Sequence, residues 1–240
     1  MVQTETATLK VSDGTSMQAF IARPAGNGTH PGVIVFQEAF GVNAHIRDVL
    51  ARFAREGYVA IAPELFHRSA AGFEGSYSDF ESTRAHTSKM TDDGLAADVR
   101  ATYGFLRAFP HTDPQKIGSV GFCMGGRASY FANAHLPLQC SVSFYGGRLV
   151  PGYLPLAQRM HAPILLFWGG LDSSIPPDQR QAVADALREA GKIFEAVEFS
   201  YAGHGFFCDA RASFHQGAAE QAWSLTTAFM RVAFQGLLGA

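Results

Sequence analysis

A cysteine lies in a glycine-rich turn of the kind that holds a catalytic nucleophile. The chain reads G-F-C-M-G-G-R from Gly121, which matches the strand-to-helix pattern G-x-S-x-G with cysteine in the serine position. Glycines at Gly121 and Gly125 would prevent collisions between the turn and its neighbouring strand and helix. The turn would also place Cys123 at a helix N-terminus, where the peptide dipoles favour the nucleophilic thiolate.

Two other interpretations of this turn stand beside the catalytic one. A small cysteine among glycines could simply pack in the core. A glycine-rich turn before a helix could also bind a phosphate. The glycines at positions 118, 121, 125 and 126 fit neither G-x-G-x-x-G nor G-x-x-x-x-G-K-S/T, so the phosphate interpretation has little support.

An acid and a histidine follow the cysteine in the order that a nucleophile of this type requires. Asp172 comes directly after a predicted strand, and His204 follows the next predicted strand within G-H-G-F. Asp172 would orient His204, and His204 would take the proton of Cys123. Either residue alone could be an ordinary turn or surface residue, so the argument depends on the three occurring together.

A loop earlier in the chain could complete the site. Q-E-A-F-G begins at Gln37, directly after an apolar run. A loop in this place supplies one backbone N–H of an oxyanion hole, and the residue after the nucleophile supplies another. Here those amides belong to Ala39 and Met124. Glu38 is unusual, because its charge would repel the developing oxyanion unless it points away into an ion pair, for instance with Arg127.

Strands and helices alternate along the chain. Two β-rich runs, 7–11 and 17–22, flank Asp13-Gly14 and predict an antiparallel hairpin. Parallel strands need crossover connections, so the later alternation predicts an α/β fold with a mostly parallel sheet and helices on both faces. The expected strands are 33–36, 58–62, 117–122, 140–144, 164–167 and 194–199, and the expected helices are 46–54, 95–109, 127–134, 177–190 and 216–234.

The segment from Phe66 to Met90 lacks a clear pattern and is rich in serine, glycine, histidine and phenylalanine. Long irregular segments in compact domains are commonly functional loops or lids. The alternative is a partly helical surface excursion without a role.

Composition excludes several other classes of protein. The chain has 240 residues, of which 47% are hydrophobic and 17% charged, which excludes disorder and favours one domain over residues 1–240. A formal net charge of −2 gives no sign of nucleic-acid binding. No apolar run reaches the ~20 residues of a membrane helix. The N-terminus lacks a secretory signal, and the three cysteines are irregularly spaced, so we expect a cytoplasmic protein without disulfides or zinc.

Together these residues resemble the dienelactone hydrolases (carboxymethylenebutenolidases) of the α/β-hydrolase superfamily. The resemblance covers essentially the whole chain, and its marks are Q-E-A-F-G at Gln37, G-F-C-M-G-G-R at Gly121, L-D at Leu171 and G-H-G-F at Gly203. It implies an α/β-hydrolase fold and a Cys123–Asp172–His204 triad. It also implies that Glu38 meets the resting thiol and assists its ionisation when substrate arrives, and that Phe40 forms part of the pocket wall.

One position departs from this family. Members that open dienelactone carry an arginine four residues after the histidine, where it binds the substrate carboxylate, and this chain has Cys208 there. Arg84 and Arg211 are candidates to replace it, although each could be a plain surface arginine. Phe206 lies beside the predicted histidine and is a further candidate for contact with an apolar acyl group. The departure bears on the substrate and not on the family.

We therefore expect an ester or lactone hydrolase that acts on a small molecule through a thioester on Cys123, with no metal or organic cofactor. The alternative is a ligand-binding or regulatory protein on the same scaffold, because fold alone does not give function. Covalent labelling of Cys123 with loss of activity on an aryl ester would separate the two. Neither the identity of the substrate nor the oligomeric state follows from the sequence.

Overall fold

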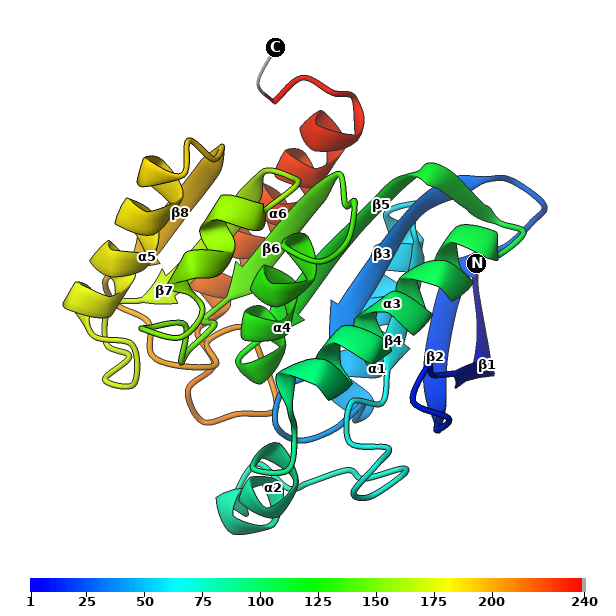
Figure 1. Cartoon of the computed structure of the whole chain (residues 1–240), viewed down its shortest axis with the longest axis horizontal. Helices are drawn as coiled ribbons and strands as arrows, with labels where there is room; N and C mark the ends of the chain where they lie inside the picture. Colours follow the sequence, from blue (N-terminus) through cyan, green and yellow to red (C-terminus); the bar gives the residue numbers. More distant parts are fainter. Residues whose placement is uncertain (239–240) are drawn as a thin grey trace. The chain divides into compact units, whose positions relative to one another are not determined.

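The computed structural model describes residues 1–238. The chain divides into two compact units, residues 1–118 and the part from Ser119 onward, and the border falls inside strand β5 (Thr112–Phe122). Strands flanked by helices make up each unit (Figure 1). The fold is mixed α/β with a mostly parallel sheet, as the alternating pattern predicts. The expectation of one domain over residues 1–240 stays a prediction.

The first unit contains the antiparallel part of the sheet. Its strand order is β1-β2-β4-β3-β5. β1 (Val2–Lys10) and β2 (Ser16–Pro24) form the predicted antiparallel hairpin. β4 (Val59–Pro63) pairs antiparallel with β2 and parallel with β3 (His30–Phe36). All of β4 and most of β3 are buried, which explains why their sequences are apolar without alternation.

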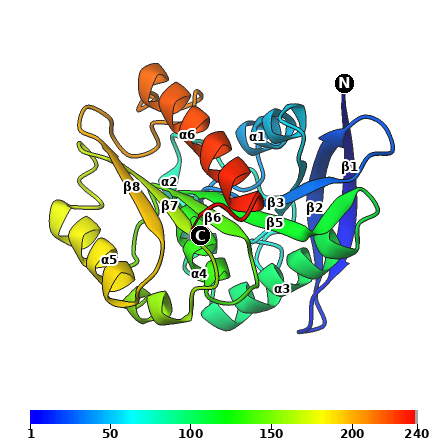
Figure 2. The same cartoon turned by 90° about the horizontal axis from the view of Figure 1, so that it is seen from above.

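Two helices cover opposite faces of the first unit's strands (Figure 2). α1 (Ala44–Arg55) begins where the side chain of Asn43 accepts a hydrogen bond from the amide of Ile46 at 3.2 Å, which satisfies one donor of the first turn. The chain leaves α1 through Gly57, whose φ of 91° suits glycine. α3 (Asp92–Ala108) lies on the other face.

The second unit has the strand order β5-β6-β7-β8, and its pairs β6–β7 and β7–β8 are parallel. Its further strands are β6 (Cys140–Phe144), β7 (Ile164–Gly169) and β8 (Phe194–Phe199). Its helices are α4 (Met124–Asn133), α5 (Pro177–Glu189) and α6 (Gln216–Phe234). α4 and α5 lie on one face of these strands and α6 on the other (Figure 2). Within residues 1–238 no helix is long and apolar enough to cross a membrane.

The structure adds two elements that the sequence did not predict. One is α2 (Phe80–Thr87), and the other is a short 3-10 helix, Leu154–Arg159. Only Thr83 is buried in α2, so this helix lacks the apolar stripe by which a pattern is recognised. The segment from Phe66 to Met90 is thus partly helical, as the second interpretation of it expected.

Candidate active site

Cys123 occupies the turn between β5 and α4. Its φ is 56° and its ψ −115°, a conformation that costs a residue with a side chain about 1–3 kcal/mol. Its amide donates to the carbonyl of Phe144 at 3.0 Å, and its carbonyl accepts from the amide of Gly126 at 2.9 Å. Met124 is the first residue of α4. The half-buried thiol is therefore held at a helix N-terminus, as predicted.

Glycines permit this turn. A Cβ atom on Gly121 would lie 1.8 Å from the carbonyl oxygen of Gly125, so the predicted need for glycine at Gly121 is confirmed. A Cβ on Gly126 would lie 2.6 Å from the carbonyl oxygen of Phe144 and 2.9 Å from the Cα of Gly146. Sequence reasoning missed this second requirement, because the atoms in question belong to a segment far along the chain.

The two carboxylate oxygens of Asp172, which follows β7, have different partners. Its Oδ2 lies 2.7 Å from Nδ1 of His204. Its Oδ1 accepts hydrogen bonds from the amide of Ser174 at 2.9 Å and from the hydroxyl of Ser174 at 2.6 Å. Burial opposes ionisation, but the interactions with His204 and Ser174 outweigh it and lower the pKa of Asp172. A charged carboxylate therefore faces the imidazole.

The loops that carry Asp172 and His204 lie side by side. The amide of Leu171 donates to the carbonyl of Ala202 at 3.0 Å. A Cβ on Gly169 would lie 2.5 Å from that same carbonyl oxygen, so only glycine allows the two loops to approach this closely. This contact explains how residues from the ends of two neighbouring strands come within hydrogen-bond distance.

His204 interacts with both of the other predicted catalytic residues. Burial disfavours its imidazolium form, but hydrogen bonds and charge interactions with Asp172 and Cys123 outweigh burial and raise the pKa of His204 to about 10. The structure thus brings together the three residues that the sequence singled out in the second unit. An imidazolium between a carboxylate and a sulfur can transfer a proton to or from a group that reacts at the sulfur.

Tyr145 also lies at this site, and sequence reasoning missed it. It follows β6 directly, has a φ of 38° and is fully buried. Its ring centroid lies 5.1 Å from that of His204 and 5.3 Å from that of Phe206. Phe206, a predicted substrate contact, is itself fully buried. The two glycines after Tyr145 are the one sequence signal of a tight turn here.

The two candidate arginines have different surroundings. The guanidinium of Arg211 packs on the turn that follows His204, since a Cβ on Gly205 would lie 2.3 Å from its Nη1. Arg84 is exposed on α2, in a surface groove that Phe80 also lines. Cys208 is fully buried and presents no cation.

The remaining predicted residues belong to the first unit, in the loop after β3. Glu38 and Phe40 are buried, and Ala39 is half-buried. The buried side chain of Gln37 donates to the carbonyl of Glu38 at 3.3 Å and accepts from the amide of Leu65 at 3.1 Å. Gln37 therefore fixes the start of this loop against the chain that follows β4.

Comparison with protein families gives a match over most of the chain. The model described as "Dienelactone hydrolase family" matches residues 17–234. A "Putative carboxymethylenebutenolidase" of Synechocystis sp. is 36% identical over 214 residues, which cover 85% of this chain and 87% of the relative. A protein of the same name from Salmonella typhimurium is 38% identical over 226 residues, covering 88% of this chain and 81% of the relative.

Comparison with solved structures agrees. The crystal structure of a "Putative Dienelactone Hydrolase" from Klebsiella pneumoniae superposes with a TM-score of 0.88 at 33% identity. The match covers 96% of this chain and 99% of that structure. The fold expected from the resemblance is therefore the fold observed.

We expect Asp172→Asn to lower the pKa of His204 from its value of about 10, because a neutral amide stabilises the imidazolium less than a carboxylate does. The same rise in the pKa of His204 determines how the stability of the folded protein changes with pH. The stabilisation that His204 contributes is fully present below its unfolded value of 6.5 and is lost as the pH rises through about 10. NMR titration of the imidazole Cε1 proton measures the pKa.

Ser173→Ala is the matched control, because Ser173 is exposed beside Asp172 and Ser174 and makes none of the contacts described above. Its titration should match that of the unmodified protein. A midpoint near 6.5 in the unmodified protein, or no change in Asp172→Asn, would contradict the assigned charge interaction.

Proposed function

The chain belongs to the dienelactone hydrolase family, and we propose that it hydrolyses an ester or a lactone through an acyl thioester on Cys123. The observation that carries the proposal is the arrangement of the second unit, in which His204 interacts with both Cys123 and Asp172. Cysteine, histidine and aspartate in this relation form the acyl-transfer constellation that recurs on unrelated folds. No step of the proposed reaction needs a metal or an organic cofactor.

The first half of the proposed reaction forms the thioester. The sulfur of Cys123, as a thiolate beside the imidazolium of His204, attacks the substrate carbonyl carbon, and the carbonyl electron pair moves to oxygen. The amides of Met124 and Ala39 are proposed to stabilise that oxyanion. As the intermediate collapses, the leaving alkoxide takes the proton of His204, which becomes neutral.

The second half releases the acid. A water molecule attacks the thioester carbonyl and gives a proton to neutral His204, which acts as general base. Collapse of this second intermediate breaks the carbon–sulfur bond and expels the thiolate, so the thiolate–imidazolium pair is restored. Asp172 stabilises the imidazolium at both ends of the cycle, and its bonds to Ser174 keep it ionised and in place.

Glu38 is proposed to assist ionisation of the thiol when substrate arrives, as the family resemblance implies. Its side chain is completely buried. A carboxylate that stayed charged beside the oxyanion would remove several kcal/mol of the stabilisation that such a site provides. In the proposed role, Glu38 takes the proton of the resting thiol when substrate arrives and becomes neutral, and it returns that proton to the sulfur after the thiolate has been expelled.

The substrate is proposed to be a neutral ester or lactone. Cys208 stands where an arginine would bind a carboxylate, and it is fully buried. The guanidinium of Arg211 is in contact with the backbone of Gly205, and Arg84 is on the exposed face of α2. A substrate carboxylate therefore has no cation at the position of Cys208 to bind it.

We predict that iodoacetamide modifies Cys123 before the other two cysteines near neutral pH, with parallel loss of activity on an aryl ester. Burial raises the pKa of the Cys140 thiol, so Cys140 should react slowest. His204→Ala should reduce turnover at least ~10²-fold, which is the lower end for loss of a general base. Peptide mass spectrometry identifies the modified cysteine, and an ester assay measures the loss of turnover. Faster labelling of Cys140 or Cys208 would contradict the activated-thiol account.

We also predict that kcat/KM for an anionic lactone exceeds that for a matched neutral lactone by no more than about tenfold, equivalent to ~1.4 kcal/mol. The reason is the absence of a cation at Cys208. Steady-state kinetics on the matched pair measures the ratio. A much larger preference for the anion that disappears in Arg84→Ala or Arg211→Ala would show that another arginine binds the carboxylate.

A further inference from the structure

The segment from Phe73 to Tyr77 packs directly on the loop after β3, and all of these residues belong to the first unit. The amide of Gly75 donates to the carbonyl of Phe40 at 3.0 Å. The carbonyl oxygen of Phe73 lies where a side chain on Gly41 would begin, 1.8 Å from the position of a Cβ. Gly41 has a φ of 80°, so both its conformation and its neighbour require glycine.

Tyr77 contacts this loop at two points. Its ring centroid lies 4.5 Å from that of Phe40, and its phenolic oxygen accepts a hydrogen bond from Nδ2 of Asn43 at 2.9 Å. Asn43 also caps α1 through the amide of Ile46. The side chain of Tyr77 thus connects Phe40, in the middle of the loop, to Asn43, where α1 begins.

An ion pair adds a third connection. The guanidinium of Arg47 binds both carboxylate oxygens of Glu74, at 2.6 and 3.0 Å. The same guanidinium donates to the carbonyl of Val42 at 2.7 Å. Bidentate pairing fixes the direction of the guanidinium as well as its distance, so Glu74 helps to orient a group that holds the end of the loop.

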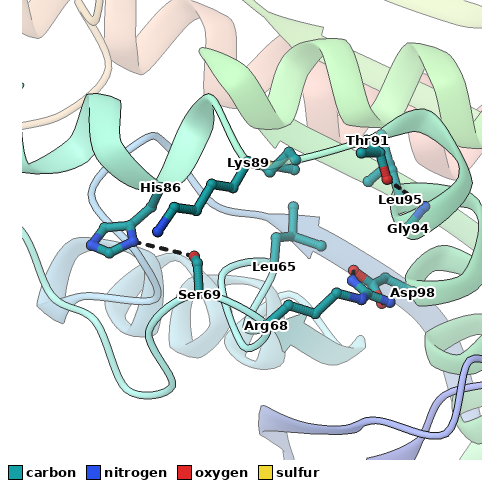
Figure 3. A pocket seen from close by; sticks show the side chains of 10 residues that line it. Leu65, Arg68, Ser69, His86, Lys89, Thr91, Gly94, Leu95 and Asp98 are labelled. Atoms are coloured by element: carbon teal, nitrogen blue, oxygen red, sulfur yellow. Dashed lines mark hydrogen bonds and ion pairs between the residues drawn. The ribbon is translucent and has the colours of Figure 1, made fainter.

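One contact anchors the start of the segment from Phe66 to Met90 to α3, and a second joins that start to α2. Arg68 forms two hydrogen bonds of 2.8 Å with the buried carboxylate of Asp98 on α3. His86 on α2 lies 3.2 Å from the hydroxyl of Ser69. Figure 3 shows these pairs around a pocket of about 180 Å³. A segment that is held in this way can in turn hold the loop on which it packs.

We propose that Phe73 to Tyr77 form a strap that holds the loop after β3 in the conformation needed for its amides to donate, with Tyr77 as the main positioning residue. This inference rests on the proposed function, in which the amide of Ala39 contributes to an oxyanion hole. Such a donor must be held within about 0.5 Å of its productive position. The strap fixes the carbonyl of Phe40, which belongs to the second peptide group after that of the donor, and so restricts the backbone that carries the donor.

The test compares Tyr77→Leu, which loses the ring and the hydroxyl, with Tyr77→Phe, which loses only the hydrogen bond from Asn43. Tyr103→Leu is the control, because Tyr103 is a half-buried tyrosine on α3 of the same unit and makes none of the contacts described above. Three quantities are measured on the full chain: steady-state turnover of an aryl ester, the rate at which iodoacetamide alkylates Cys123, and hydrogen exchange of the amides of residues 38–42.

For Tyr77→Leu we expect kcat to fall about tenfold with little change in KM, because loss of a well-placed oxyanion donor acts on the transition state. Alkylation should stay within about twofold of the original rate, since it forms no oxyanion. Exchange of amides 38–42 should accelerate about tenfold or more, because fewer bonds resist local opening. Tyr77→Phe should show a smaller change in the same direction, and Tyr103→Leu should show none.

Unchanged exchange in both Tyr77 variants would overturn the strap, whatever the kinetics. Faster exchange with unchanged kcat would overturn its role in positioning the donor. A fall in kcat matched by an equal fall in alkylation would assign the effect to Cys123 and also overturn the inference. If the unmodified protein turns over no ester or lactone, the proposed function fails on that result, and hydrogen exchange alone then decides whether the strap holds the loop.

Discussion

The strained backbone of Cys123 is the constraint on which the rest of the second unit depends. A chain that passes from β5 into α4 through one residue at positive φ exposes that residue's side chain at the helix N-terminus. The turn is possible only because Gly121 and Gly126 have no Cβ atom, which would collide with the carbonyl of Gly125 and with the carbonyl of Phe144 at the end of β6, respectively. Strain of about 1–3 kcal/mol persists only where the surroundings over-determine the conformation, and here two strands and a helix do so.

His204 connects the turn at Cys123 to the loop that carries Asp172 through interactions between charged groups. The carboxylate of Asp172 and the sulfur of Cys123 both interact with the imidazole, and together they hold the pKa of His204 far above its ordinary value. Ser174 occupies the second oxygen of Asp172 with two hydrogen bonds, so that the oxygen facing His204 has a defined direction. In the first unit, by contrast, the loop with Glu38 and Ala39 has no regular structure, and its order comes from Gln37 and from the segment Phe73 to Tyr77.

Much of this could be predicted because its causes are local. The elbow pattern at Cys123, the strands β6 and β8 and the helix α6 follow from spacing and hydrophobic periodicity, and they have the predicted positions. Tyr145, Gly126 and the contact between Tyr77 and Phe40 could not be predicted, because each depends on segments distant in the sequence. α2 could not be predicted from hydrophobic periodicity, because Thr83 is its one buried residue. The roles of Cys123, Asp172 and His204 stay predictions from order and geometry.

The central claim is that an acyl group passes through the sulfur of Cys123, and rapid acid quenching during turnover of an aryl ester tests it most directly. Mass spectrometry of the quenched protein should find the acyl group on the peptide that contains Cys123. The adduct should be removed by hydroxylamine, as a thioester is, and should be absent when Cys123 is alkylated beforehand. Turnover that continues after alkylation of Cys123, or an acyl group found only on another residue, would contradict the account.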